Sequence, residues 1–162
     1  MALSQEIKTK IDDMRKVFPT SEALLIPLLH AIQEEKGHIS RDSMKEAAVF
    51  LQLPFKKIRE VVTFYTMFNE KPMGKVHLQF CTNIACWLKG ADHLLHCAEK
   101  RLGIKCGETT PDGQFTISEV ECLAACGTAP VVQVNDLYCE NLDEKKLLEL
   151  IDNAKAKEQK RQ

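Results

Sequence analysis

Along the first part of the chain, apolar residues recur every three or four positions, which is the spacing of one face of a helix. The pattern predicts four helical segments with short connections, over residues 4–18, 21–37, 40–51 and 55–68. Serine stands at the start of the first three segments, where its side chain can cap the helix, and Pro54 precedes the fourth. Pro27 lies inside the second segment, where it either kinks the helix or sits in its first turns, and we expect the helix to be continuous with a distortion. Together the four segments predict a small N-terminal helical bundle.

The period changes after Gly74 from helical spacing to alternation. Val76, Leu78 and Phe80 alternate with polar residues, which predicts a strand with one buried face. Further elements are predicted downstream: a helix from Cys86 to Gly103, a strand over residues 114–120, a hairpin over residues 131–139 and a helix from Asp143 whose basic end frays from Lys155. This order predicts a small mixed sheet with helices on it. The expected fold class is α+β, with a helical bundle over residues 1–72 and a sheet domain over residues 73–162.

The charges of the chain give no broad field of either sign. There are 22 Lys and Arg against 23 Asp and Glu, a formal net charge of −1, so we expect no nucleic-acid partner and no attraction to anionic lipid. The start of the chain lacks the basic flank and apolar core of a secretory signal, and no apolar run is long enough for direct membrane insertion. These observations predict a cytosolic protein whose partners are proteins or a small redox centre.

The chain has seven cysteines, an odd number, which argues against a disulfide framework in a protein without an export signal and favours metal binding. Four of them form two pairs, Cys81 with Cys86 and Cys122 with Cys126. Within one helix, Cys81 and Cys86 would point about 140° apart, so at least one of them must lie outside a helix. Each pair follows a predicted strand, and one end of the sheet can therefore present both loops. Cys86 is predicted at a helix start, whose partial positive charge would stabilise its thiolate.

The spacing of the pairs leaves more than one kind of site open. The four-residue gap of the first pair suits a [2Fe-2S] cluster, whereas zinc modules mostly repeat a two-residue gap. A structural zinc module stays an alternative, and a thiol–disulfide oxidoreductase ranks last because a Cys-x-x-Cys motif is absent. The other cysteines are expected to be small hydrophobic residues without a ligand role: Cys97, Cys106 and Cys139.

Five stretches of the chain carry a resemblance to a known family: residues 62–68, 71–75, 81–86, 121–126 and 129–136. Together they resemble the NuoE-type family, the thioredoxin-like [2Fe-2S] subunits of NADH:quinone oxidoreductase (complex I), with relatives in NAD-linked hydrogenases and formate dehydrogenases. The resemblance implies a thioredoxin-like ferredoxin fold after the helical bundle. It also implies one [2Fe-2S] cluster, with these four metal ligands: Cys81, Cys86, Cys122 and Cys126.

The same resemblance implies an electron-transfer subunit of an NADH dehydrogenase complex, with no catalytic residues of its own. Its cluster would exchange single electrons with the FMN of a NuoF-type, NADH-binding partner, and the chain would contact other subunits of the hydrophilic arm. The chain has no G-x-G-x-x-G motif after a strand, so FMN and NADH are expected on the partner. The implied location is cytoplasmic, peripheral to the inner face of a membrane. The equivalent subunit of an NAD-linked hydrogenase or formate dehydrogenase is the alternative.

Overall fold

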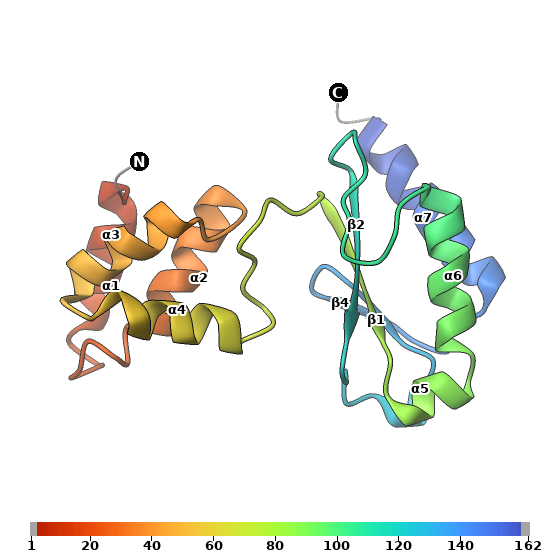
Figure 1. Cartoon of the computed structure of the whole chain (residues 1–162), viewed down its shortest axis with the longest axis horizontal. Helices are drawn as coiled ribbons and strands as arrows, with labels where there is room; N and C mark the ends of the chain where they lie inside the picture. Colours follow the sequence, from red (N-terminus) through yellow and green to blue (C-terminus); the bar gives the residue numbers. More distant parts are fainter. Residues whose placement is uncertain (1–2, 160–162) are drawn as a thin grey trace. The chain divides into compact units, whose positions relative to one another are not determined.

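The chain divides into two compact units, Met1–Pro72 and Met73–Gln162. Figure 1 colours the chain along its sequence, from red at the N-terminus to blue at the C-terminus. The computed structural model describes residues 3–159, with side chains through residue 156, so the end of the predicted basic tail lies outside the described residues. The first unit is helical, and the second contains a sheet with helices. The α+β fold class predicted from the sequence is confirmed.

Four helices form the first unit: α1 (Gln5–Met14), α2 (Leu25–Lys36), α3 (Arg41–Leu51) and α4 (Phe55–Phe64). Two of the predicted serine caps are present. The Ser4 hydroxyl accepts a hydrogen bond from the backbone N–H of Ile7 at 3.2 Å, and the Ser40 hydroxyl accepts one from Ser43 at 3.1 Å. Each cap satisfies a backbone donor that the helix itself leaves free.

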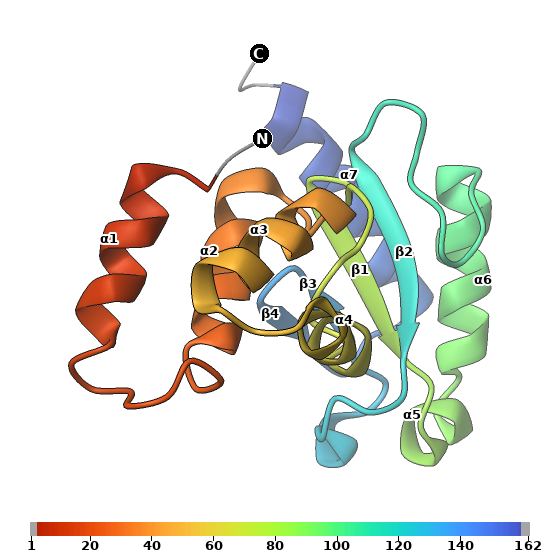
Figure 2. The same ribbon diagram turned by 60° about the vertical axis from the view of Figure 1, so that its left-hand side comes forward.

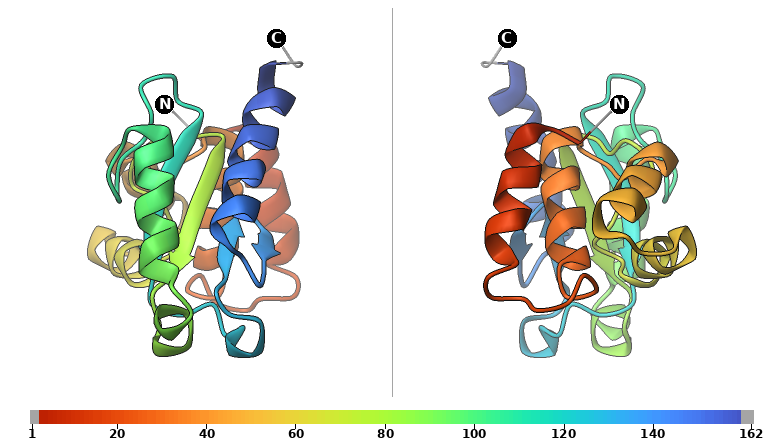
Figure 3. Two further views of the ribbon diagram at one scale, coloured as in Figure 1. Left: turned by 90° about the vertical axis from the view of Figure 1, so that its right-hand side faces the viewer. Right: turned by 90° about the vertical axis from the view of Figure 1, so that its left-hand side faces the viewer.

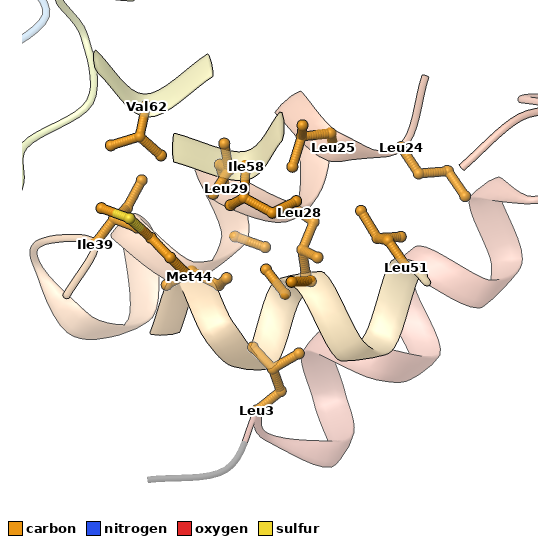
Figure 4. Close-up of a cluster of buried hydrophobic side chains, with 14 of the residues drawn as sticks. Leu3, Leu24, Leu25, Leu28, Leu29, Ile39, Met44, Leu51, Ile58 and Val62 are labelled. Atoms are coloured by element: carbon orange, nitrogen blue, oxygen red, sulfur yellow. The ribbon is translucent and has the colours of Figure 1, made fainter. Parts of the chain in front are cut away.

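Leucine and isoleucine side chains from different helices meet in the core of this unit. Leu28 and Leu29 of α2 lie next to Ile58 of α4, and Met44 of α3 lies near them (Figure 4). The first three of these side chains are fully buried. Complete burial of one such side chain stabilises the fold by about 1.5–3 kcal/mol, so the unit has a core of its own.

Three details of the helical prediction are wrong. The first helix ends at Met14 instead of Phe18, because residues 15–17 form a turn. The second helix begins at Leu25 instead of Ser21, because residues 21–24 form turns, and this places Pro27 in the first turn of α2. A backbone N–H in the first turn has no partner within the helix, so proline fits there without the expected distortion. The fourth helix ends at Phe64, before Tyr65 takes an extended conformation, and does not continue to Phe68.

The second unit is built on a four-stranded mixed sheet with the order β2-β1-β3-β4. Its strands are β1 (Val76–Cys81), β2 (Phe115–Val120), β3 (Val132–Val134) and β4 (Leu137–Cys139). Strand β1 pairs in parallel with β2 and antiparallel with β3, and β3 and β4 form the predicted hairpin. Helices α6 (Ala91–Leu102) and α7 (Glu144–Gln159) lie side by side over one face of the sheet (Figure 3, left). The predicted mixed sheet with helices on it is therefore confirmed.

The predicted helix from Cys86 to Gly103 is interrupted. A short helix, α5 (Ile84–Leu88), is followed by Gly90 with a φ of 89°, and α6 starts only at Ala91. Glycine takes this left-handed conformation without steric cost, which allows the chain to turn between the two helices. The hydrophobic spacing alone did not reveal this turn. Because α5 begins at Ile84, Cys86 is its third residue and not its first.

Candidate metal centre

The two cysteine loops leave the same end of the sheet because β1 and β2 are parallel neighbours. Cys81, the last residue of β1, is in register with Val120, the last residue of β2. Figure 2 shows the two loops below this end of the strands, one leading into α5 and the other into the short turn after β2. The Asn83 side chain donates a hydrogen bond to the Glu121 carbonyl at 3.2 Å and thereby ties one loop to the other. The predicted juxtaposition of the loops is confirmed.

The four cysteines of these loops, which we call the cysteine site, differ in burial. Cys81 and Cys86 are 3% and 2% exposed, whereas Cys122 and Cys126 are exposed. The Cys86 and Cys122 thiols lie close enough to Cys81 to lower its pKa, and the Cys126 thiol is close enough to Cys86 to act on it electrostatically. One side of the site is thus dry, and the other faces the surface.

Backbone N–H groups surround the buried thiols. Burial opposes ionisation of Cys81, but the N–H groups of Asn83 and Leu123 and the neighbouring thiols outweigh it, so the pKa of Cys81 falls below its ordinary value. Burial and the nearby Cys81 raise the pKa of Cys86, and a hydrogen bond from the Val131 backbone offsets only part of this rise. The stabilised thiolate is therefore Cys81. The expectation that a helix start would favour the thiolate at Cys86 is wrong, because burial and the nearby Cys81 outweigh any stabilisation by the first turn of α5 and raise the pKa of this thiol.

The second loop bends to direct a backbone donor at sulfur. Ala124 has a φ of 56°, a conformation that residues with a side chain rarely adopt, and its N–H donates to the Cys122 sulfur at 3.2 Å. Such N–H···S contacts stabilise thiolates and tune a metal site. Sequence reasoning anticipated small residues here but missed Asn83, whose only signal was an amide side chain directly before the helix.

The sulfur positions can be compared with two kinds of metal. A single tetrahedral zinc ion would hold all four sulfur atoms within about 4 Å of one another. Within the described residues, one compact group of possible metal ligands lies elsewhere in the unit, formed by His93, Cys97 and Glu144, whose ligand atoms all lie within 4.8 Å of one another. The four cysteines are not part of such a group. Two irons divide four thiolates into two pairs, which can lie further apart. Four cysteine thiolates in two pairs are the donor set that a two-iron cluster takes.

The remaining cysteines lie outside this site. Cys106 and Cys139 pack against the sheet core, and burial raises the pKa of each thiol. Cys97 is partly buried on α6, where its sulfur lies 3.5 Å from a ring nitrogen of His93. Trp87 is 55% exposed next to Cys86, so it is not a core residue.

The family to which this chain belongs is that of the thioredoxin-like [2Fe-2S] ferredoxins, whose sequence pattern it matches over residues 11–155. Among its relatives is the E-type component of the NADH-quinone oxidoreductase of Rickettsia prowazekii, 48% identical over 131 residues that span 79% of this chain and 73% of the relative. A second E-type component, from the NADH-quinone oxidoreductase of Rhizobium meliloti, is 41% identical over 94% of this chain and 90% of its own length. The sequence resemblance to this family is thereby confirmed.

A solved structure supports the fold. A chain of an NAD⁺-reducing [NiFe]-hydrogenase in its H2-reduced state superposes on 79% of this chain with a TM-score of 0.69 and 20% identity. This chain spans only 22% of that hydrogenase chain, so the likeness concerns the fold alone. Among the described residues, every helix falls short of the length and apolarity that a membrane span requires.

Proposed function

We propose that this chain is the electron-transfer subunit of an NADH:quinone oxidoreductase, and that the cysteine site binds one [2Fe-2S] cluster. The observation that carries the proposal is the convergence of the four thiols at one end of the sheet, in a chain of the [2Fe-2S] ferredoxin family. When bound, such a cluster accepts and returns one electron at a time. The chain is thus one part of an oxidoreductase and has no complete active site of its own.

The residues around the cysteine site have distinct tasks. Cys81 and Cys86 hold the dry side, where a low dielectric strengthens every electrostatic interaction. The N–H groups of Asn83, Leu123 and Ala124 point at sulfur, and they stabilise negative charge there. Because reduction adds one negative charge, these donors favour the reduced form and raise the reduction potential.

An apolar surface next to the cysteine site suits a protein partner. Ile84, Trp87 and Leu88 of α5 are 69%, 55% and 71% exposed, and they flank the buried Cys86. Clustered exposed apolar side chains of this kind mark interaction sites. The partner proposed for this surface is the FMN-bearing, NADH-binding NuoF-type subunit, since electron exchange requires the two redox centres to come close. We also propose that FMN and NADH stay on the partner, and that the chain is a peripheral part of a complex at the cytoplasmic face of a membrane.

A second candidate is the equivalent subunit of an NAD-linked hydrogenase, which the likeness of fold to the hydrogenase chain favours. Purification of the native protein with its partners separates the two candidates. Recovery with an FMN-containing subunit and other subunits of a quinone-reducing complex supports the first candidate. Recovery with a nickel-containing subunit instead overturns it.

The cluster itself is tested by anaerobic purification, metal and sulfide analysis, and EPR after reduction. We expect two irons and two sulfides per chain, and a signal from one unpaired electron. Cys86→Ser and Cys122→Ser should lose most of the iron, whereas Cys139→Ser, the matched control in the same unit, should retain it. A colourless protein with one zinc per chain, or equal iron loss in all three variants, contradicts the ligand assignment.

The docking surface has its own test. Trp87→Ala and Leu88→Ala should weaken binding of the FMN-bearing subunit at least about tenfold, as expected for central apolar contacts of an interface. Their iron content should stay at the wild-type level. Val49→Ala, which removes an 80% exposed apolar side chain from the helical unit, is the control. If the α5 variants bind the partner as tightly as the control does, the partner docks elsewhere.

A further inference from the structure

A second cluster of metal-ligating side chains lies on the two helices that cover the sheet. It consists of His93 and Cys97 of α6 and Glu144, the first residue of α7. We propose that these residues, the α6–α7 trio, bind one divalent transition-metal ion of the zinc class. The site is independent of the cysteine site and of electron transfer.

The helix geometry brings the three ligand atoms together. His93 and Cys97 are four residues apart on α6, so their side chains lie one turn apart on the same face. The His93 Nε2 atom lies 2.9 Å from Glu144 Oε2 and 3.5 Å from Cys97 Sγ. All three ligand atoms lie within 4.8 Å of one another, the compact arrangement that the cysteine site lacks.

These separations are close to those around a tetrahedral zinc ion. Bond lengths of about 2.0–2.1 Å to N and O and about 2.3 Å to S give edges of about 3.3 Å between N and O and about 3.6 Å between N and S. The observed N···S distance already matches, and the N···O distance needs to open by a few tenths of an ångström. The side chains of His93 and Glu144 are 63% and 54% exposed, so they have room for this shift.

The surroundings leave space for a fourth ligand. The trio lines a surface hollow of about 480 Å³, in which a water molecule can complete a tetrahedron. Lys100 and Arg101 also line the hollow and would repel a bare cation. Arg101 is already paired with Asp152, and one thiolate with one carboxylate neutralises a divalent ion. The bound site is therefore formally neutral, and on binding the thiol proton of Cys97 passes to solvent.

The residue types also favour a metal over a simple polar contact. A hydrogen bond between His93 and Glu144 would join α6 to α7 without help from sulfur. Cys97 nevertheless places its sulfur within reach of the same imidazole nitrogen, although a thiol is a weak hydrogen-bonding group. Nitrogen, sulfur and carboxylate oxygen are the three donors that zinc accepts in proteins. An ion held by all of them would join residues 51 positions apart in the chain.

The test uses the full-length, cluster-loaded protein after removal of adventitious metal, with Zn²⁺ in calorimetry and Co²⁺ in absorption difference spectra. We expect one ion per chain and a thiolate-to-cobalt charge-transfer band. Cys97→Ser should remove this band and weaken binding at least about tenfold, and Glu144→Gln should weaken binding without removing the band. Asp92→Asn, which changes an exposed carboxylate on the same helix that does not line the hollow, should bind as the wild type does.

Three results would overturn the proposal. The first is the lack of a stoichiometric binding step in the wild type. The second is unchanged binding in both Cys97→Ser and Glu144→Gln. The third is a loss of the iron–sulfur absorbance in parallel with metal uptake, which would show that the added ion enters the cysteine site instead. The iron content of the same sample reports separately on the [2Fe-2S] proposal, so failure of one proposal is not mistaken for failure of the other.

Discussion

Gly74, just before β1, lies so close to the backbone of β2 that no side chain fits. A Cβ atom at this position would stand 2.6 Å from the carbonyl carbon of Phe115, 2.8 Å from its nitrogen and 2.9 Å from its Cα. An ordinary contact between such atoms is about 3.5 Å, so the Gly74→Ala substitution forces the strands apart by roughly 0.9 Å. The obstacle is backbone in a buried strand, which cannot rotate away as a side chain would.

The cost of this displacement follows from the contacts that it breaks. The N–H of Gly74 donates to the buried Thr116 hydroxyl at 2.7 Å, and the N–H of Val76 donates to the Gln114 carbonyl at 2.8 Å. Moving β2 by roughly 0.9 Å takes both beyond hydrogen-bonding distance, at about 1 kcal/mol each. Overpacking adds a further contribution, and we expect a total of about 3 kcal/mol. For a unit of this size, that corresponds to a fall of about 12–24 °C in the midpoint of thermal unfolding.

The assay is thermal unfolding of the cluster-loaded protein, followed through the fluorescence of Trp87, the single tryptophan, which lies in the same unit. Gly127→Ala is the matched control, because its Cβ would meet nothing within 4 Å and its φ lies outside the left-handed region. The control should unfold within about 3 °C of the wild type. If Gly74→Ala also unfolds within this range, the packing argument is refuted.

Three further predictions concern single side chains. Asn83→Ala removes both the cap of α5 and the hydrogen bond to the Glu121 carbonyl, so the free energy of unfolding of the unit should fall by about 1–2 kcal/mol. Iron should also pass to a chelator faster, and an unchanged transfer rate would contradict the role of the Asn83–Glu121 bond in holding the two loops together. Burial lowers the pKa of His77 below its ordinary 6.5, so the unfolded chain takes up the proton first as the pH falls. The stability of the fold therefore decreases between about pH 6.5 and the lower folded-state pKa, by at most about 1.4 kcal/mol per pH unit. His77→Gln should lack this part of the loss in urea titrations at several pH values, and identical pH profiles would count against it. Ser40→Ala should lower the stability of the helical unit by about 1 kcal/mol, measured as faster amide exchange along α3, with no change expected in the sheet unit.

Elements with a strong hydrophobic period could be predicted from the sequence, and their ends could not. The alternation around Leu78 defined β1, and the residues of the β3–β4 hairpin were found because a turn pair separates two short apolar runs. Spacing gave no sign that the helix after Cys86 breaks at Gly90, since both pieces keep the same apolar spacing. Helix propensity also could not decide whether Pro27 kinks the helix or lies in its first turn, because the answer depends on the residue at which the helix begins.

The candidate metal centre was partly predictable for a similar reason. Strand–loop patterns put both cysteine pairs at one end of a sheet, but the charge on each thiol depends on N–H groups whose direction only the folded loops define. The sequence predicts only that a helix start stabilises a thiolate at Cys86, whereas in the folded loops the pKa of Cys86 is raised and that of Cys81 is lowered. The α6–α7 trio was out of reach, because Glu144 follows Cys97 by 47 residues and only the packing of two helices brings them together.

The parallel pairing of β1 with β2 has a consequence for when the cysteine site can form during synthesis on the ribosome. Cys122 follows Cys81 by 41 residues, and β3, the other neighbour of β1, is made later still. At about 5–20 residues per second, the first cysteine pair waits roughly 2–8 s before the second pair even exists. Non-local strand pairing of this kind is also slow to form. Delivery of iron and sulfide is therefore expected after synthesis, onto a finished sheet, and not onto the growing chain.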